Sequence, residues 1–142
     1  MGPTTRSTRL VALGAALLIL AAGLTVRAVT AGAFAKYAGV ALYAALVYAL
    51  AVLLAPRVRP LWTATAAVAF CWLVEFAQLT SVPANLSARS GLARLVLGST
   101  FHPPDLFWYV VGVAATAGVD ATVRATVARG PGRATDRSAD RP

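Results

Sequence analysis

Residues 37–55 read YAGVALYAALVYALAVLLA, and none of these side chains is charged. At a rise of about 1.5 Å per residue, a helix of this length is close to the thickness of a hydrocarbon core, roughly 30 Å. Its apolar residues keep no period of about 2 or 3.6, which indicates a helix that faces lipid on all sides. The run predicts a transmembrane helix that ends before Pro56, because proline cannot continue the hydrogen-bonding pattern of a helix.

Three further apolar runs predict three more spans, at residues 10–26, 61–79 and 106–127. The turn at residues 56–60 is too short to recross a membrane, so the third span must be antiparallel to the second. The fourth contains Asp120 and Arg124, which lie four residues apart and are expected to pair on one helical face. The predicted fold is an all-α, small polytopic membrane bundle of about four transmembrane helices, which form a single domain at residues 10–127.

The first apolar run also fits an alternative, a cleaved secretory signal peptide. Arg6 and Arg9 precede the run, and the small residues at 31–33 resemble a cleavage site. The run is longer than the apolar core of a typical signal peptide, about 7–15 residues, which favours a retained span.

Residues 80–105 form the longest connection between two spans and lie on the outer side in this topology. Within it, residues 86–97 are mostly apolar, include Arg89 and end at Gly98, a residue that often follows a helix. This stretch is too short to cross a bilayer, so it predicts one interfacial or re-entrant helix against the outer leaflet.

The composition excludes several classes of protein. Hydrophobic residues make up 58% of the chain and charged residues 13%, against about 25% charged residues in soluble domains. The net charge of +8 comes from residues beside the spans rather than from a basic and aromatic platform, so no nucleic-acid partner is expected. Cys71 is the single cysteine and His102 the single histidine, so no metal site and no cofactor is predicted, and Cys71 is expected to be buried.

The basic residues predict the orientation in the cell membrane. With the N-terminus inside, nine lie on the cytoplasmic side and four outside; the four are Arg27, Lys36, Arg89 and Arg94. An excess of Lys and Arg marks the cytoplasmic side. Both termini are therefore predicted in the cytoplasm, as a segment at residues 1–9 and a disordered polar tail at residues 128–142.

This topology brings the polar side chains together at the outer leaflet. The predicted ligand-binding residues are Arg27, Lys36, Glu75, Gln78, Arg89, Asp105 and Tyr109. Glu75 lies within the apolar zone, where an unpaired ionised carboxylate costs about 2–3 kcal/mol. We therefore expect Glu75 to pair with Arg27, Lys36 or Arg89, or to hold its proton, and Gln78 on the same face to donate to it.

Asp105 has two interpretations. It follows Pro103-Pro104, where an N-cap residue would accept amides of the first helical turn. It also shares a helical face with Tyr109 and Gly112, and the glycine would let a neighbouring helix approach closely.

His102 either acts alone as an acid or base or is a solvated loop residue.

The polar residues also carry a resemblance to a known family. The series Lys36-Tyr37-x-Gly39-x-x-Leu42-Tyr43, Glu75-Phe76-x-Gln78-Leu79 and Asp105-Leu106-x-x-Tyr109-x-x-Gly112 resembles the bacterial membrane family called domain of unknown function 2809, over roughly residues 10–120. The second half is also similar to the VanZ-like family, which is linked by name to glycopeptide antibiotic resistance. That similarity implies a role in the cell envelope, with Glu75, Gln78, Arg89 and Asp105 as the corresponding positions.

Val40 and Tyr43 depart from the pattern, which has an acidic residue and a tryptophan there. This departure weakens an enzymatic interpretation more than one of binding. Three hypotheses follow: an envelope module that binds a lipid headgroup, a lipid-linked precursor or a glycopeptide-related ligand; an enzyme on such a lipid, with Glu75 or Asp105 as general base; and a small proton-coupled transporter that uses Glu75.

Overall fold

The computed structural model describes residues 5–98 and 100–129, and within this part the chain forms six α-helices and no strand. They are α1 (Thr5–Val29), α2 (Gly32–Leu54), α3 (Pro60–Ala77), α4 (Ser81–Arg89), α5 (Gly91–Leu97) and α6 (Pro103–Ala128). The predicted N-terminal segment up to residue 4 and the predicted tail from residue 130 lie outside the described residues. Four helices, α1, α2, α3 and α6, are long and apolar enough to cross a membrane, which confirms the predicted all-α bundle.

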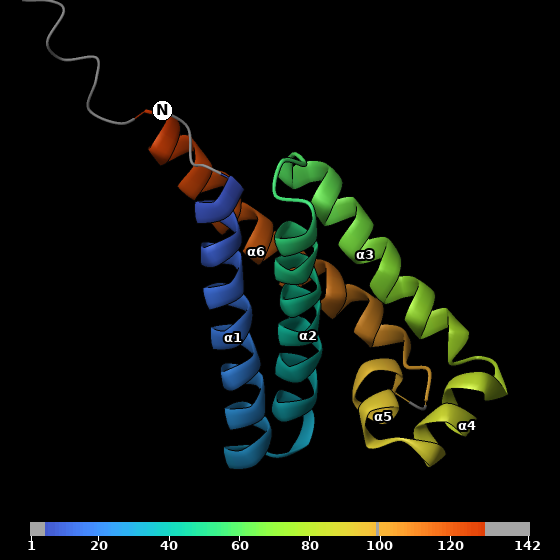
Figure 1. Cartoon of the computed structure of the whole chain (residues 1–142). Coiled ribbons are helices and arrows are strands. Elements are labelled where there is room, and N and C mark those ends of the chain that lie inside the picture. The colour runs from blue at the N-terminus through green and yellow to red at the C-terminus, as the bar shows by residue number, and fades with distance from the viewer. Residues whose placement is uncertain (1–4, 99, 130–142) are drawn as a thin grey trace, which may run out of the picture.

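The long helices alternate in direction (Figure 1). The start of α1, the turn between α2 and α3, and the end of α6 lie at one end of the bundle. The turn between α1 and α2, together with α4 and α5, lies at the opposite end, which we call the α5 end. Helix α2 is central, since it contacts α1, α3 and α6.

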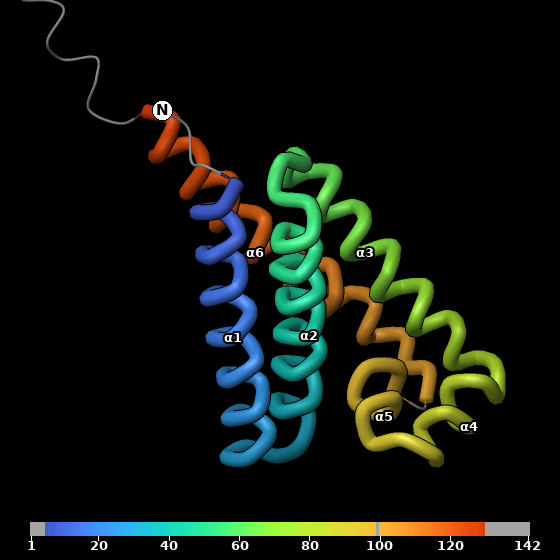
Figure 2. The backbone as a smooth tube through the Cα atoms, in the orientation of Figure 1, coloured from blue at the N-terminus to red at the C-terminus, as the bar shows by residue number. Residues whose placement is uncertain are grey.

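Helices α2 and α3 diverge from their shared turn towards the α5 end (Figure 2). Helix α6 runs obliquely across α2 and also packs against α3. At the α5 end, α4 follows the end of α3, and α5 lies on the side of α4 that faces α2. This divergence, rather than a parallel four-helix arrangement, leaves room for the site described below.

The core consists largely of small side chains together with Tyr48 and Tyr109. Its fully buried members include Ala44, Ala67 and Cys71, as expected for the single cysteine. Large side chains such as Leu18 and Leu54 face outward, where lipid would surround them. Small residues at helix contacts and large ones on the outer surface are typical of helices packed in a membrane.

Gly112 lets α6 approach α2 closely. A Cβ atom at this position would overlap the backbone carbonyl of Ala41. The close approach expected from the sequence is therefore confirmed, and only glycine fits without moving one helix away from the other.

The predicted single helix over residues 86–97 is wrong, because two short helices occupy this region. Ser90 has an extended backbone (φ −146°, ψ 124°), and its hydroxyl accepts a hydrogen bond from the amide of Ala93 at 3.3 Å. Serine at an N-cap competes with a continuous helix in this way. Thr80 caps α4 similarly, and Gly98 (φ 63°) ends α5 as predicted.

We expect Gly112→Ala to lower the free energy of unfolding by about 1–3 kcal/mol, because the new methyl group must push two backbones apart. Gly118→Ala is the matched control on the same helix, since a Cβ there has no neighbour within 4 Å. Unfolding in mixed micelles with increasing SDS measures both. Equal stability of the two variants would contradict the close contact.

Candidate ligand-binding site

A cavity of about 740 Å³ lies at the α5 end, among α1, α2, α3, α5 and α6. Its size is in the range of small-molecule sites, about 300–1,000 Å³. Six of the seven predicted ligand-binding residues line it: Arg27, Lys36, Glu75, Gln78, Asp105 and Tyr109. The other walls are apolar and include Leu20 and Leu24 of α1, Leu42 and Leu46 of α2, and Leu95 of α5.

Arg89 is the predicted residue that does not line the cavity. It is exposed in the last turn of α4, where a basic side chain suits the negative end of the helix dipole. Because the helix is interrupted at Ser90, the face of α4 that carries Arg89 does not continue into α5, which lines the cavity.

Glu75 is 1% exposed and accepts two hydrogen bonds. The backbone amide of His102 donates to Oε1 at 2.6 Å, and the hydroxyl of Tyr109 donates to Oε2 at 2.9 Å. Among the described residues no cation lies within ion-pair distance of this carboxyl group. The expectation that Arg27, Lys36 or Arg89 pairs with Glu75 is therefore wrong, because neutral donors from α6 and its preceding loop reach the carboxyl group instead.

Through these bonds Glu75 completes the start of α6. The helix begins at Pro103, and its N-cap residue His102 makes no capping bond with its own side chain. The two prolines at the first helical positions have no amide hydrogen, which reduces the number of unpaired donors at this end. In a capping box, the amide of the N-cap residue is bound by a Glu of the same helix. Here the N-cap residue is His102, and its amide is bound by Glu75 of a different helix, α3.

Asp105 is not the N-cap, which corrects one interpretation of the sequence. It is the third residue of α6 and is 8% exposed. Its Oδ1 atom is buried, makes no hydrogen bond with the described residues, and lies 4.0 Å from Nζ of Lys36. Since Glu75 binds the amide of His102, the carboxyl group of Asp105 is not needed for capping.

Gln78 also differs from expectation. Its Nε2 atom donates to the carbonyl of Leu97 at 2.7 Å and not to Glu75, while its Oε1 atom is buried without a hydrogen-bond partner among the described residues. Gly98 lies against this amide: a Cβ there would be 2.8 Å from Nε2. Gln78 thus holds the end of α5 in place and forms part of the cavity wall.

Arg27 is exposed in the last turn of α1 and forms no ion pair with the described residues. The side chain of Lys36 is 45% exposed, so its contact with Asp105 at 4.0 Å is weak. Two cations at the same cavity are therefore available to a ligand.

Two aromatic residues have a role that the sequence did not reveal. Tyr43 donates to the carbonyl of Val96 at 2.9 Å and its ring packs on Tyr109, 6.2 Å between centroids. Tyr37 stacks on the rings of both His102 and Trp108. Tyr43 lines the cavity, and Tyr37 packs beside the start of α6; the positions of both in the family motif were the available signal.

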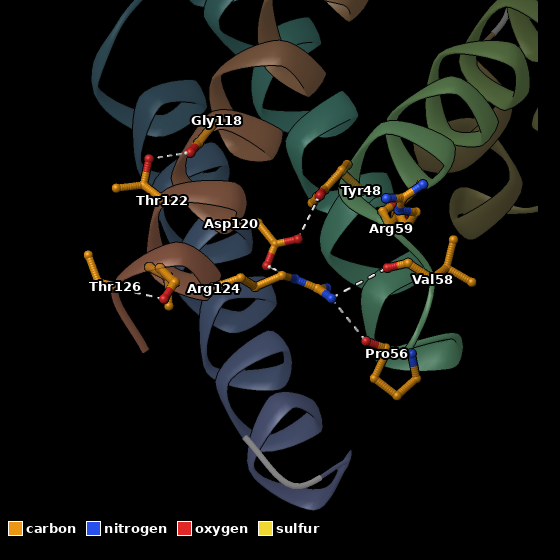
Figure 3. A network of polar contacts seen from close by, with 11 residues as sticks. Tyr48, Pro56, Val58, Arg59, Gly118, Asp120, Thr122, Arg124 and Thr126 are labelled. Carbon is orange, nitrogen blue, oxygen red and sulfur yellow. Dashed lines mark hydrogen bonds and ion pairs between the residues drawn. The ribbon is translucent and has the colours of Figure 1, made fainter. Parts of the chain in front are cut away.

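A second polar network lies near the other end of the bundle (Figure 3). Arg124 donates to Asp120 at 2.8 Å, which confirms the predicted pair, and Tyr48 donates to the same carboxyl group at 2.8 Å. Arg124 also binds the carbonyls of Pro56 and Val58 at 3.2 and 3.4 Å. These contacts pair the two charges within the fourth span and attach α6 to the turn between α2 and α3, while Nη2 of Arg124 is buried without a hydrogen-bond partner among the described residues.

A family model described as Protein of unknown function (DUF2809) matches residues 29–113, more than half of the chain. The chain belongs to this family. The DUF2809 match includes Lys36, Glu75, Gln78, Asp105 and Tyr109, whereas Arg27 precedes it. Comparisons with curated proteins and with solved structures gave no match. The similarity to the VanZ-like family and its implied envelope role stay predictions.

The hydrogen bonds of Glu75 predict a specific order of stabilities. Glu75→Leu leaves the partly buried amide of His102 without its acceptor and should lower the free energy of unfolding by about 1–3 kcal/mol. Glu75→Gln keeps an oxygen for this amide and offers its NH₂ group to the oxygen of Tyr109, so the loss should be smaller.

Tyr109→Phe is the companion variant. It removes the hydroxyl donor to Glu75 and should lower the free energy of unfolding by about 1 kcal/mol. Unfolding in mixed micelles ranks the three. If Glu75→Leu is as stable as Glu75→Gln, the carboxyl group does not complete the start of α6.

Proposed function

We propose that this DUF2809 protein binds the phosphate-bearing headgroup of a lipid or a lipid-linked precursor in the cavity at the α5 end. The observation that carries the proposal is the presence of two available cations, Arg27 and Lys36, in one cavity whose other walls are largely apolar. Arg and Lys side chains bind phosphate oxygens, and apolar walls accept hydrocarbon. An amphiphile matches both.

Binding is better supported than catalysis or transport. Both carboxyl oxygens of Glu75 accept hydrogen bonds that hold the start of α6, which gives this residue a structural role and makes it a weaker candidate for a general base than Asp105. A proton carrier would need access from both sides, whereas the described contacts of Glu75 all lie towards the α5 end. The enzyme and transporter hypotheses therefore rank second.

We place the protein in the cell membrane with both termini in the cytoplasm, so that the cavity opens in the outer leaflet. Two observations support this orientation. The start of α1 and the end of α6 lie at the same end of the bundle, and the excess of basic residues is on that side.

Cysteine labelling tests the orientation. In a Cys71→Ala background, Ser90→Cys should react with an impermeant thiol reagent added to intact cells, because Ser90 is exposed at the α5 end. Arg57→Cys, exposed in the turn at the opposite end, should react only after permeabilisation. Reaction of both from the same side would exclude the four-span topology.

Native mass spectrometry of the purified chain with added phospholipids tests binding. Arg27→Ala and Lys36→Ala should each weaken binding by about tenfold, because each removes a charge-assisted contact to phosphate. Arg89→Ala removes the same charge on the same side but outside the cavity, so its affinity should equal that of the wild type. Equal losses in all three variants would instead indicate non-specific attraction to phosphate.

A further inference from the structure

The cavity is lined by both basic and acidic side chains. Its lining includes the cations Arg27 and Lys36 and the acidic residues Glu75 and Asp105. A purely anionic headgroup would meet the cations but also two acids. A ligand with separated positive and negative groups fits such a lining better, since each charge then meets its opposite.

The two acids differ in what they can offer a ligand. Glu75 is occupied by the amide of His102 and the hydroxyl of Tyr109. The side chain of Asp105 is 11% exposed, lines the cavity, and has one oxygen that accepts no hydrogen bond from the described residues. Gln78 contributes a second buried acceptor without a donor, Oε1.

Buried acceptors without donors are uncommon and costly, and where they line a cavity they are suited to a ligand that brings the missing donors. Nζ of Lys36 does not supply this bond, because 4.0 Å to Oδ1 of Asp105 exceeds a hydrogen-bond distance. Oδ1 of Asp105 thus has a cation at ion-pair distance but no hydrogen-bond donor among the described residues.

We infer that the headgroup bound here carries a primary ammonium beside its phosphate, as in phosphoethanolamine, with the ammonium donating to Asp105 and Gln78. The inference rests on the proposed function and specifies the ligand class for the same cavity. A choline headgroup has the same charges but no N–H, so it cannot satisfy these acceptors. The apolar walls assign the phospholipid, rather than free phosphoethanolamine, as the source.

A methylation series of one lipid tests the inference. The full chain in detergent is titrated with phosphatidylethanolamine, its N-methyl and N,N-dimethyl derivatives and phosphatidylcholine, all with identical acyl chains, and binding is read by native mass spectrometry. Along this series the ammonium loses its N–H donors one at a time, and phosphatidylcholine has none. Because the ammonium donates to two acceptors, we expect similar affinities for the first two lipids, a fall at the N,N-dimethyl derivative, which can satisfy only one acceptor, and a total fall of about tenfold or more at phosphatidylcholine.

Asp105→Asn should remove this difference by lowering the affinity for phosphatidylethanolamine to that for phosphatidylcholine, while Arg89→Ala should preserve it. Equal wild-type affinities for all four lipids, or a loss that grows evenly with each methyl group, would overturn the ammonium inference. If Arg27 is still required in that case, the proposed phosphate site stands. If no lipid binds in an Arg27-dependent way, both fail.

Free phosphoethanolamine provides the last arm. It should compete at least tenfold less well than the lipid, because it makes no contact with the apolar walls. Equal competition would overturn the phospholipid source.

Discussion

The buried carboxyl group of Glu75 is the contact on which the α5 end of the molecule depends. It joins α3 to the first residues of α6, and the amide that it binds is a donor that water would otherwise have to satisfy. In a bilayer such a donor needs a partner within the protein. An acidic residue inside a span thus binds, first of all, the backbone that leads into a neighbouring helix, and the fixed start of α6 places Asp105 and Tyr109 beside the cavity.

The remaining geometry follows from two contacts along α6. Gly112 brings α6 onto α2, and the network of Tyr48, Asp120 and Arg124 attaches its far end near the turn after α2. Because α3 packs on α6 and diverges from α2, the space at the α5 end is closed by a short helix rather than by a fifth span. That short helix is held by hydrogen bonds to its carbonyls, for example from Gln78 and Tyr43.

The sequence was sufficient to predict the four spans, because long uncharged runs have few other interpretations. It was also sufficient to predict that six polar residues lie close together, because the topology places them at the same end of the bundle. It was insufficient for the partners of Glu75. A backbone amide and a tyrosine hydroxyl carry no charge by which they stand out in a sequence, so the nearby basic residues were favoured instead. Arg89 was misplaced for a related reason: one extended residue, Ser90, divides the predicted helix and changes which face continues.

The position of α1 has a consequence for how such a cavity can diversify. This helix packs chiefly on α2, supplies one apolar wall and Arg27, and precedes the region shared with the family. None of the described hydrogen bonds that hold α3, α5 and α6 together involves α1. Substitutions on the cavity side of this one helix would therefore alter the shape and charge of the binding surface, whereas its buried residues Ala12 and Ala16 are tied to the packing of the bundle.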